Sequence, residues 1–325
     1  MTRRIDAKPT VTTRSGQLAN SCPAADLATD RDALSCATAA QWRSAALRAA
    51  CGQLHESWLD VKAREIGIVA GSGFAVLATG SLGRRELLPH SDLDLLLVHD
   101  NMSDHAVEKI AEGLWYPLWD ARVRLDHSVR TIPQALKVAG SDMLAGLAML
   151  EARHIAGDER LSHRLISAAR KQWQHGIAAR YDDLVELSHS RWQRNGDIAG
   201  SPAPDLKNGR GGLRDVQLLH ALVLSHRVDR KSTGVANPLK GLLREAHRLV
   251  LDVRTELHRA CGRSNDLLTA EYADDIIGAL GLVGRGDLAA HLSDAAQIIS
   301  TRVDAELQAV ASAVRHRGAS SAISA

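Results

Sequence analysis

Two carboxylates at the start of an apolar strand constrain this chain more than any other feature. Residues 74–100 read FAVLATGSLGRRELLPHSDLDLLLVHD, and the apolar runs at 74–78 and 93–98 predict two buried strands. Asp92 and Asp94 flank the first residue of the second run, and side chains two residues apart on a strand share a face. Because two like charges there repel each other and lose hydration, the pair indicates a neutralising divalent cation.

A glycine–serine turn follows the first of these strands. Gly80 lets the backbone approach a phosphate closely, and backbone amides near Ser81, with its hydroxyl, can donate to phosphate oxygens. Arg84 lies on the same connection and adds positive charge. Magnesium is usually held by one or two carboxylates plus substrate phosphates, so the segment predicts a metal–nucleotide site. The alternative is an ordinary turn before a core strand, which leaves Asp94 inside the apolar run unexplained.

The pattern of apolar residues changes along the chain. Helical spacing over 39–66 predicts a long amphipathic helix, and a helix over 105–120, bent by Pro117, precedes a third strand at 122–130. Strand signals nearly vanish after residue 131. Helices are expected at 132–154, 159–173, 178–194, 213–227, 237–261, 271–281 and 286–312. The predicted fold class is α+β, with a small mixed sheet followed by an all-α region.

These patterns divide the chain of 325 residues into four parts. We expect a disordered leader at 1–36, a sheet domain with its N-terminal helix at 37–140, a helical domain at 141–315 and a disordered tail at 316–325. The division separates the carboxylate pair from most of the helices.

Composition excludes several classes of partner. The chain carries 40 basic and 38 acidic residues, so no field of one sign favours DNA or RNA. The four cysteines lack the spacing of a zinc site or a disulfide framework and are expected to be reduced thiols. No apolar stretch is long enough to span a bilayer, and no apolar run follows the first basic residues. A cytoplasmic protein without a membrane partner is therefore expected.

Two further segments carry candidate residues. Alternation over 122–130 places Asp126 on the polar face, as a third carboxylate or as the partner of Arg124 or Arg130, and both interpretations stay open. The loop DLKNGRGGLRD at 205–215 combines Lys207 and two arginines with glycines before a helix. Such a loop can cradle an anion, and the alternative is a plain connection with solvated charges.

Four blocks of the sequence resemble bacterial protein-PII uridylyltransferases. They are GSLGRRELLPHSDLDLLLVHD at 80–100, LWYPLWD at 114–120, LDHSVRT at 125–131 and DLKNGRGGLRDVQLL at 205–219. The first block also resembles the wider nucleotidyltransferase superfamily that includes DNA polymerase beta. The chain is most similar to the actinobacterial branch, for which the resemblance implies adenylylation of PII rather than uridylylation.

The resemblance implies a small mixed-sheet nucleotidyltransferase domain followed by a helical domain. It implies that Asp92 and Asp94 are metal ligands, for two Mg²⁺ ions, and that Asp126 is a tentative third carboxylate. It also implies that the nucleophile is a tyrosine of the PII signal-transduction protein, which would attack the α-phosphate of UTP or ATP and release pyrophosphate.

The same resemblance implies the nucleotide-binding residues. Gly80 and Ser81 would contact the phosphates, Arg84 would add charge there, and Lys207 would bind the nucleotide or lie at a domain interface. A glutamine-synthetase adenylyltransferase shares the strand pair and the Lys207 loop, although the HSVRT block at 127–131 argues against it. A truncated, catalytically inactive interaction module is the other alternative, since family members continue into hydrolase and ACT domains that this sequence is expected to lack.

Overall fold

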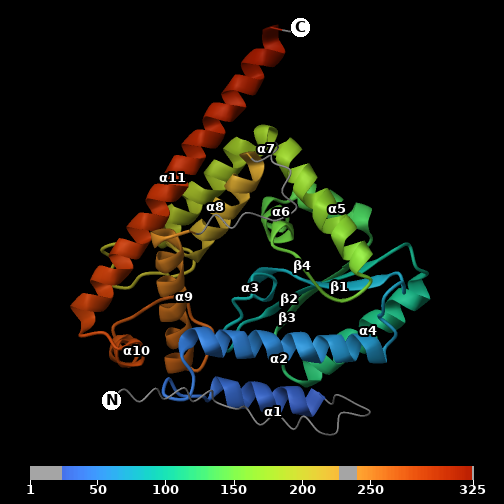
Figure 1. Cartoon of the computed structure of the whole chain (residues 1–325), viewed down its shortest axis with the longest axis horizontal. Helices are drawn as coiled ribbons and strands as arrows, with labels where there is room; N and C mark the ends of the chain where they lie inside the picture. Colours follow the sequence, from blue (N-terminus) through green and yellow to red (C-terminus); the bar gives the residue numbers. More distant parts are fainter. Residues whose placement is uncertain (1–23, 227–239, 324–325) are drawn as a thin grey trace, which may run out of the picture.

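The computed structural model describes residues 24–226 and 240–323 and centres on a four-stranded sheet (Figure 1). The strand order is β3-β2-β1-β4. The strands are β1 (Phe74–Ala78), β2 (Leu93–His99), β3 (Leu125–Arg130) and β4 (Arg153–Gly157). β1 runs antiparallel to both β2 and β4, whereas β2 and β3 are parallel. The sheet is therefore mixed, as predicted, and all five residues of β1 are buried in its middle.

Helices cover both faces of this sheet. They are α1 (Ala24–Ser35), α2 (Ser44–Glu65), α3 (Gly80–Gly83), α4 (Asp104–Asp120), α5 (Ile132–Ser141) and α6 (Met143–Leu150). Phe74, Val76 and the leucines at odd positions of β2 pack with α2 and α4. Ala75, Leu77 and the even positions pack with α5, α6 and the first turns of α7 (Glu159–Asn195). Figure 1 shows the sheet between these two helical layers. Strict alternation along β1 and β2 thus gives each layer its own core.

A second body of helices lies beside the sheet. It contains most of α7 together with α8 (Leu213–His226), α9 (Leu242–Cys261), α10 (Ala273–Leu280) and α11 (Arg285–Ile323). Trp173 Nε1 donates to the carbonyl of Ala221 at 2.9 Å, which joins α7 to α8 inside a shared core. Figure 1 shows α11 running past this body as a long rod. Within the two described ranges, no helix combines the length and apolarity needed to cross a membrane.

The structure confirms the two strands predicted around the carboxylates and corrects the region after residue 131. The single helix expected at 132–154 is two helices, because Asp142 ends α5 and caps α6 by accepting from the amide of Ala145 at 2.9 Å. The fourth strand, β4, follows at once and was not predicted. Its sequence RHIAG contains one β-branched residue, so only its pairing with β1 makes it a strand.

The chain ends also differ from expectation. Residues 1–23 of the predicted leader lie outside the described residues, but α1 occupies positions assigned to it. Leu27 is buried against the α2 layer, and Arg31 Nη1 donates to the carbonyl of Ala121 at 2.8 Å. These are tertiary contacts, which short-range periodicity does not reveal. The backbone of α11 likewise continues helically to Ile323, past the predicted start of the tail at 316. The helices expected at 159–173 and 178–194 form one helix, α7.

His55 on α2 makes the fold sensitive to acid. Burial lowers the pKa of His55 to about 4, although its Nδ1 donates to the carbonyl of Cys51 at 2.8 Å. At pH values between the ordinary pKa of 6.5 and the lowered pKa of about 4, His55 is protonated in the unfolded chain and neutral in the folded chain. Stability is therefore lost as the pH falls through this window. When the pH is lowered from 7 to 4.5, the free energy of unfolding should fall in both proteins. We expect the fall to be about 2 kcal/mol smaller in His55→Gln than in the wild type.

Denaturant titrations at the two pH values measure this difference. The same substitution at the exposed His105 on α4 is the control for a general effect of replacing histidine. Equal losses in the wild type and in His55→Gln would show that His55 is not the source of the acid sensitivity.

Candidate functional site

Parallel pairing brings two of the predicted carboxylates together. Asp94 is the second residue of β2, and its register partner in β3 is Asp126. Residues in register on neighbouring strands point to the same side of the sheet, here the side that Leu96 shares with α5, α6 and α7. Asp92 precedes β2 by one residue and lies on the same side by alternation. The structure therefore gathers all three carboxylates at the same end of β2 and β3.

The position of Asp94 disfavours the charged form of its carboxylate. Burial raises its pKa, and the neighbouring Asp126 carboxylate raises it further. Arg84 and Lys207 act in the opposite direction. The half-buried carboxylate thus lies between like charges on the sheet and cations from elsewhere, which is the setting in which a bound cation is favourable.

The open alternative for Asp126 is an ion pair with a neighbouring arginine. Arg124 Nε instead lies 2.7 Å from Asp92 Oδ1, and a second nitrogen of the same guanidinium donates to the carbonyl of His90. Within the described part of the chain, no ion pair joins Asp126 to Arg124 or Arg130. The exposed Asp126 carboxylate is therefore available next to Asp94, whereas one oxygen of Asp92 is already paired with Arg124.

These residues fit a divalent cation that is held jointly with a substrate. Over the described ranges, no three His, Cys, Asp or Glu side chains already converge as a metal cluster. Asp94 and its register partner nevertheless supply hard oxygen ligands of the kind that magnesium takes in small number, with phosphate oxygens and water completing its shell.

Gly80 allows the turn after β1 to touch the carboxylate. It begins α3 with φ +55°, and a Cβ added there would overlap Asp94 Oδ2. Thr79 donates its amide to the carbonyl of Asp94 at 2.9 Å, so the turn is also tied to β2. Ser81 follows as the second residue of α3, half-buried. The predicted glycine–serine turn and the carboxylate pair are thus adjacent.

We expect Gly80→Ala to reduce any reaction at this site by about 100-fold, because the new methyl group displaces Asp94. The strain of a left-handed alanine adds about 1–2 kcal/mol of instability. Gly71→Ala is the matched control, since Gly71 has φ +74° and nothing within 4 Å of its added Cβ. Assay of both variants separates displacement of Asp94 from backbone strain, and equal losses would contradict this explanation.

Arg84 has different contacts from those expected for a phosphate ligand. Its guanidinium lies 2.7 Å from Glu86 and 2.6 Å from Glu151, and the side chain is mostly buried. Glu86 in turn lies 3.1 Å from His247 of α9. Arg84 therefore ties the end of α3 to the end of α6 and, through Glu86, to the helical body, and its charge acts on Asp94 through space.

Lys207 reaches the site from the helical body. The carboxylate of Asp205 accepts from the amides of Lys207 at 2.9 Å and Asn208 at 2.7 Å, which shapes the glycine-rich loop. Lys207 Nζ lies 3.7 Å from Asp266, whose carboxylate is also held by Arg254 at 2.6 Å. Burial lowers the pKa of Lys207, while Asp266 raises it. The charge of Lys207 thus acts on Asp94 through space, and its pairing with Asp266 is loose.

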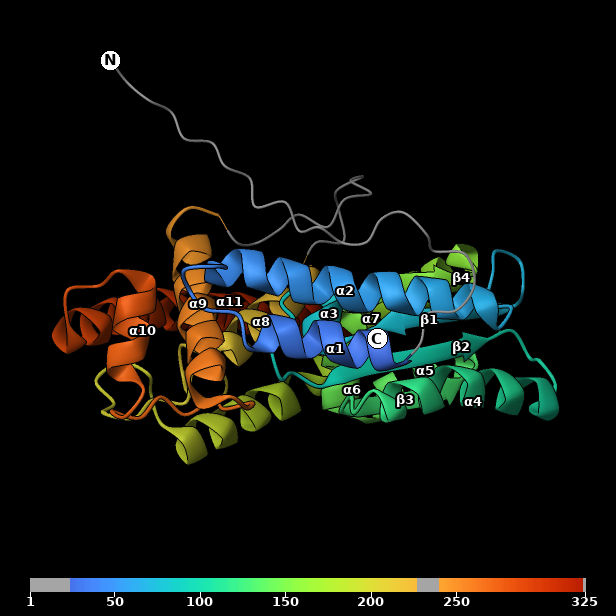
Figure 2. The same ribbon diagram turned by 90° about the horizontal axis from the view of Figure 1, so that it is seen from below.

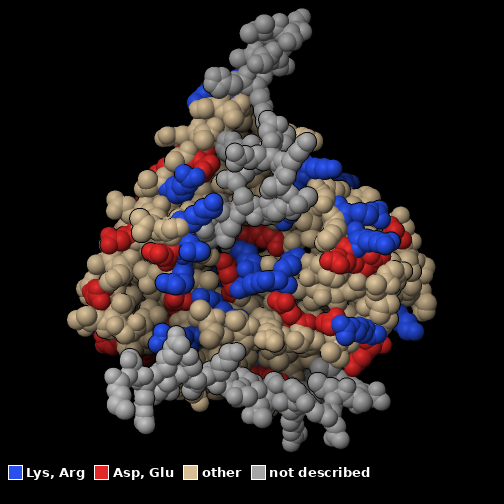
Figure 3. Space-filling view, in the orientation of Figure 1, with Lys and Arg blue, Asp and Glu red and all other residues tan. Residues whose placement is uncertain are grey.

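Arg214 is one of the two arginines of the loop at 205–215, where Lys207 is the predicted binding residue. It is the second residue of α8, and its Nε is buried without a partner. Burial lowers its pKa, and the positive charges of Arg191 and Arg84 lower it further. An anion would satisfy this guanidinium nitrogen, whereas the first amides of α8 already donate to carbonyls of the preceding loop. Figure 3 shows basic and acidic side chains crowded together in the middle of this face, between the sheet and the helical body.

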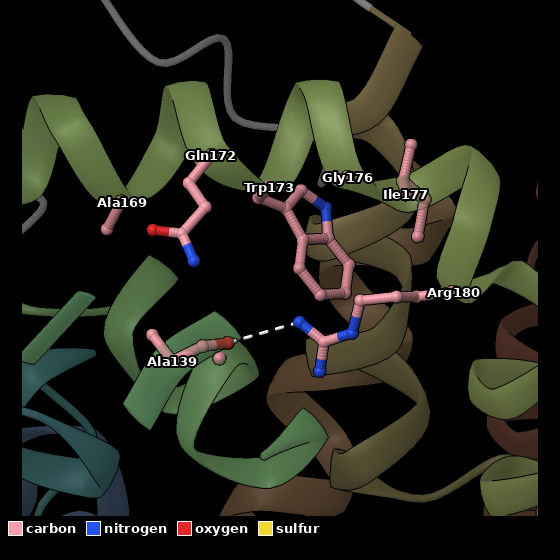
Figure 4. Close-up of a pocket in the computed structure, with 8 residues that line it drawn as sticks. Ala139, Ala169, Gln172, Trp173, Gly176, Ile177 and Arg180 are labelled. Carbon is pink, nitrogen blue, oxygen red and sulfur yellow. Dashed lines mark hydrogen bonds between the residues drawn. The ribbon is translucent and has the colours of Figure 1, made fainter. Parts of the chain in front are cut away.

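One small cavity lies away from these residues. Its volume is about 20 Å³, and it is lined by Ala139, Gly146, Ala169, Gln172, Trp173, Gly176, Ile177 and Arg180. Figure 4 shows Arg180 donating to the carbonyl of Ala139, at 3.1 Å. The cavity has room for about one water molecule, so it is too small for a nucleotide.

Two family models match separate parts of the chain. Residues 179–310 match the family model "GlnD PII-uridylyltransferase", and residues 31–119 match "Putative nucleotidyltransferase DUF294". The second match contains Gly80, Asp92 and Asp94, and the first contains Lys207 and Arg214.

Curated relatives with the name "Bifunctional uridylyltransferase/uridylyl-removing enzyme" match most of the chain. The Mycobacterium tuberculosis protein is 51% identical over 302 residues, which cover 93% of this chain and 37% of that protein. The Streptomyces coelicolor protein is 41% identical over 76% of this chain and 28% of its own length, and the Corynebacterium glutamicum protein is 41% identical over 71% and 32%. The chain therefore spans 37% or less of the length of these relatives.

Proposed function

Because the chain belongs to the GlnD PII-uridylyltransferase family, we propose that it transfers a nucleoside monophosphate from a nucleoside triphosphate to a tyrosine of a PII-type protein. The transferred group is UMP, or AMP as the actinobacterial resemblance implies. The register that places Asp94 beside Asp126, with Gly80 against Asp94, is the observation that carries this proposal.

Charge arrangement supports phosphoryl chemistry at this position. Carboxylates on the sheet side would hold Mg²⁺, which neutralises phosphate charge and favours departure of pyrophosphate. Lys207 and Arg214 approach from the helical side and would bind the remaining phosphate oxygens. The nucleotide would thus be oriented between two bodies of the fold, which is the main contribution a protein makes to such a transfer.

The acceptor supplies the nucleophile. The tyrosine oxygen forms a bond to the α-phosphorus, and the bond from that phosphorus to the α–β bridging oxygen breaks as pyrophosphate leaves. Asp126 is exposed and adjacent to Asp94, so we assign it to take the tyrosine proton. The chain's own tyrosines have no part in this scheme.

The test is incubation of the purified chain with a PII-type protein, Mg²⁺ and either UTP or ATP, followed by intact mass measurement of the acceptor. Gain of one uridylyl or adenylyl group identifies the reaction and the nucleotide together. A parallel incubation with glutamine synthetase and ATP tests the adenylyltransferase alternative. Absence of gain on either acceptor, from a folded chain, would refute the proposal and favour the inactive interaction module.

A further inference from the structure

An exposed aromatic surface lies at the outer margin of the sheet. Tyr116 and Trp119 of α4 are 54% and 45% exposed, and their rings meet edge to face at 5.4 Å. Trp119 also contacts the exposed His127 of β3, at 5.5 Å between ring centroids. We call Tyr116, Trp119 and His127 the aromatic ledge. The buried Trp115 supports it from below, 5.1 Å from His127.

The ledge borders an edge strand that also carries a site residue. β3 is the last strand at one margin of the sheet, and no strand of the described ranges pairs with its outer edge. Figure 2 shows β3 at one margin and β4 at the other. Asp126 and His127 are consecutive and both exposed, so they project to opposite faces. Asp126 therefore faces the carboxylate site on one side of the sheet, and His127 lies in the aromatic ledge on the other side.

We infer that the acceptor protein docks as an extended segment along the outer edge of β3, with an apolar side chain against the aromatic ledge. This inference rests on the proposed function. An added strand alternates in the same way as β3, so a residue opposite Asp126 faces the site while its neighbour faces Trp119. Pairing along this edge would deliver a tyrosine to Asp126 and place the adjacent side chain on the ledge.

The side chains along the outer edge of β3 indicate what kind of segment would fit this edge. Exposed aromatic edge strands promote unwanted pairing, and folded proteins usually cover or charge them. Here the exposed Arg122 lies shortly before the strand, and Arg124, next to the strand, is paired with Asp92. Trp and Tyr are also the side chains that most often dominate protein–protein binding. The fitting partner is therefore an extended segment with an apolar residue next to its tyrosine.

Trp119→Ala tests the ledge. We expect the KM for a PII-type acceptor to rise at least about 10-fold, with the KM for the nucleotide unchanged. Val283→Ala is the matched control, because Val283 is 95% exposed on the connection between α10 and α11. An unchanged acceptor KM in Trp119→Ala, or an equal rise in Val283→Ala, would overturn the assignment of the ledge.

Hydrogen exchange tests the pairing itself. On addition of the acceptor without nucleotide, the amides of β3 should become protected and those of β4, the opposite edge, should not. Protection of β4, or none at β3, would refute docking along this edge. If the wild type transfers neither nucleotide, the proposed function fails, and the docking inference is then decided by this exchange and by acceptor binding to wild type and Trp119→Ala.

Discussion

Asp94→Asn is expected to lower transfer to the acceptor by about 10³-fold, because it removes the central charge of the site. Asp94 is paired in register with Asp126 and lies against the Gly80 turn, so its carboxylate links the strand pair to the turn. Asparagine retains the shape and one oxygen but has no charge with which to bind Mg²⁺. The measurement is the initial rate of acceptor modification at saturating nucleotide and Mg²⁺.

The matched control is Asp100→Asn, just past the opposite end of β2. Asp100 is exposed and lies 3.6 Å from Arg164, outside the carboxylate group. It should keep wild-type activity. A second readout is thermal unfolding with and without Mg²⁺, which should raise the midpoint of the wild type and leave that of Asp94→Asn unchanged. Retained transfer in Asp94→Asn would place the reaction elsewhere on the chain.

Asp126→Asn divides the two roles assigned to that carboxylate. Loss of the proton acceptor alone should leave the effect of Mg²⁺ on the unfolding midpoint intact while lowering the rate. Loss of both would indicate that Asp126 is also a ligand. Alternation along the strand left open whether Asp126 belongs to the site or pairs with an arginine. Arg124 pairs with Asp92, so the comparison now asks whether Asp126 is a proton acceptor, a metal ligand or both.

Local patterns were sufficient to predict the centre of the fold. The runs at 74–78 and 93–98 are short, apolar and bounded by turn residues, as buried strands are, and alternation places Asp92 and Asp94 on one face. The positive φ of Gly80 likewise agrees with a residue type that permits close approach. These features depend on a few neighbouring residues, so sequence reasoning can reach them.

The features that could not be predicted from local patterns depend on long-range contacts. Arg84 pairs with Glu151, 67 residues away, and no periodicity of the connection after β1 indicates that partner. β4 owes its strand structure to β1, and the proximity of Lys207 to Asp94 depends on how the helical body packs. The sequence could place a basic glycine-rich loop between helices, but only the tertiary structure directs it toward the carboxylates.

Gly211→Ala is expected to lower the free energy of unfolding by about 3 kcal/mol. Gly211 has φ +81°, where a left-handed alanine costs about 1–2 kcal/mol. Its added Cβ would also lie 2.6 Å from the Cβ and carbonyl oxygen of Ala296 on α11, an overlap that costs about 1–3 kcal/mol. Since both atoms belong to a packed helix, the loop and α11 must separate to admit the methyl group.

Gly200→Ala isolates the backbone part of this effect. Gly200 is in the same connection, has φ +74° and has nothing within 4 Å of an added Cβ, so it should lose only about 1–2 kcal/mol. Denaturant titration of both variants measures the difference, and equal losses would show that contact with α11 does not matter.

Activity of the same pair tests whether α11 supports the site. The loop that contacts Ala296 also carries Lys207, and Arg210 of this loop lies 2.7 Å from Asp304 of α11. Displacing the loop should therefore move Lys207 and raise the KM for the nucleotide in Gly211→Ala, measured under conditions where the variant remains folded. Gly200→Ala should keep the wild-type KM. If Gly211→Ala also keeps it, α11 stabilises the helical body without positioning the cation opposite Asp94.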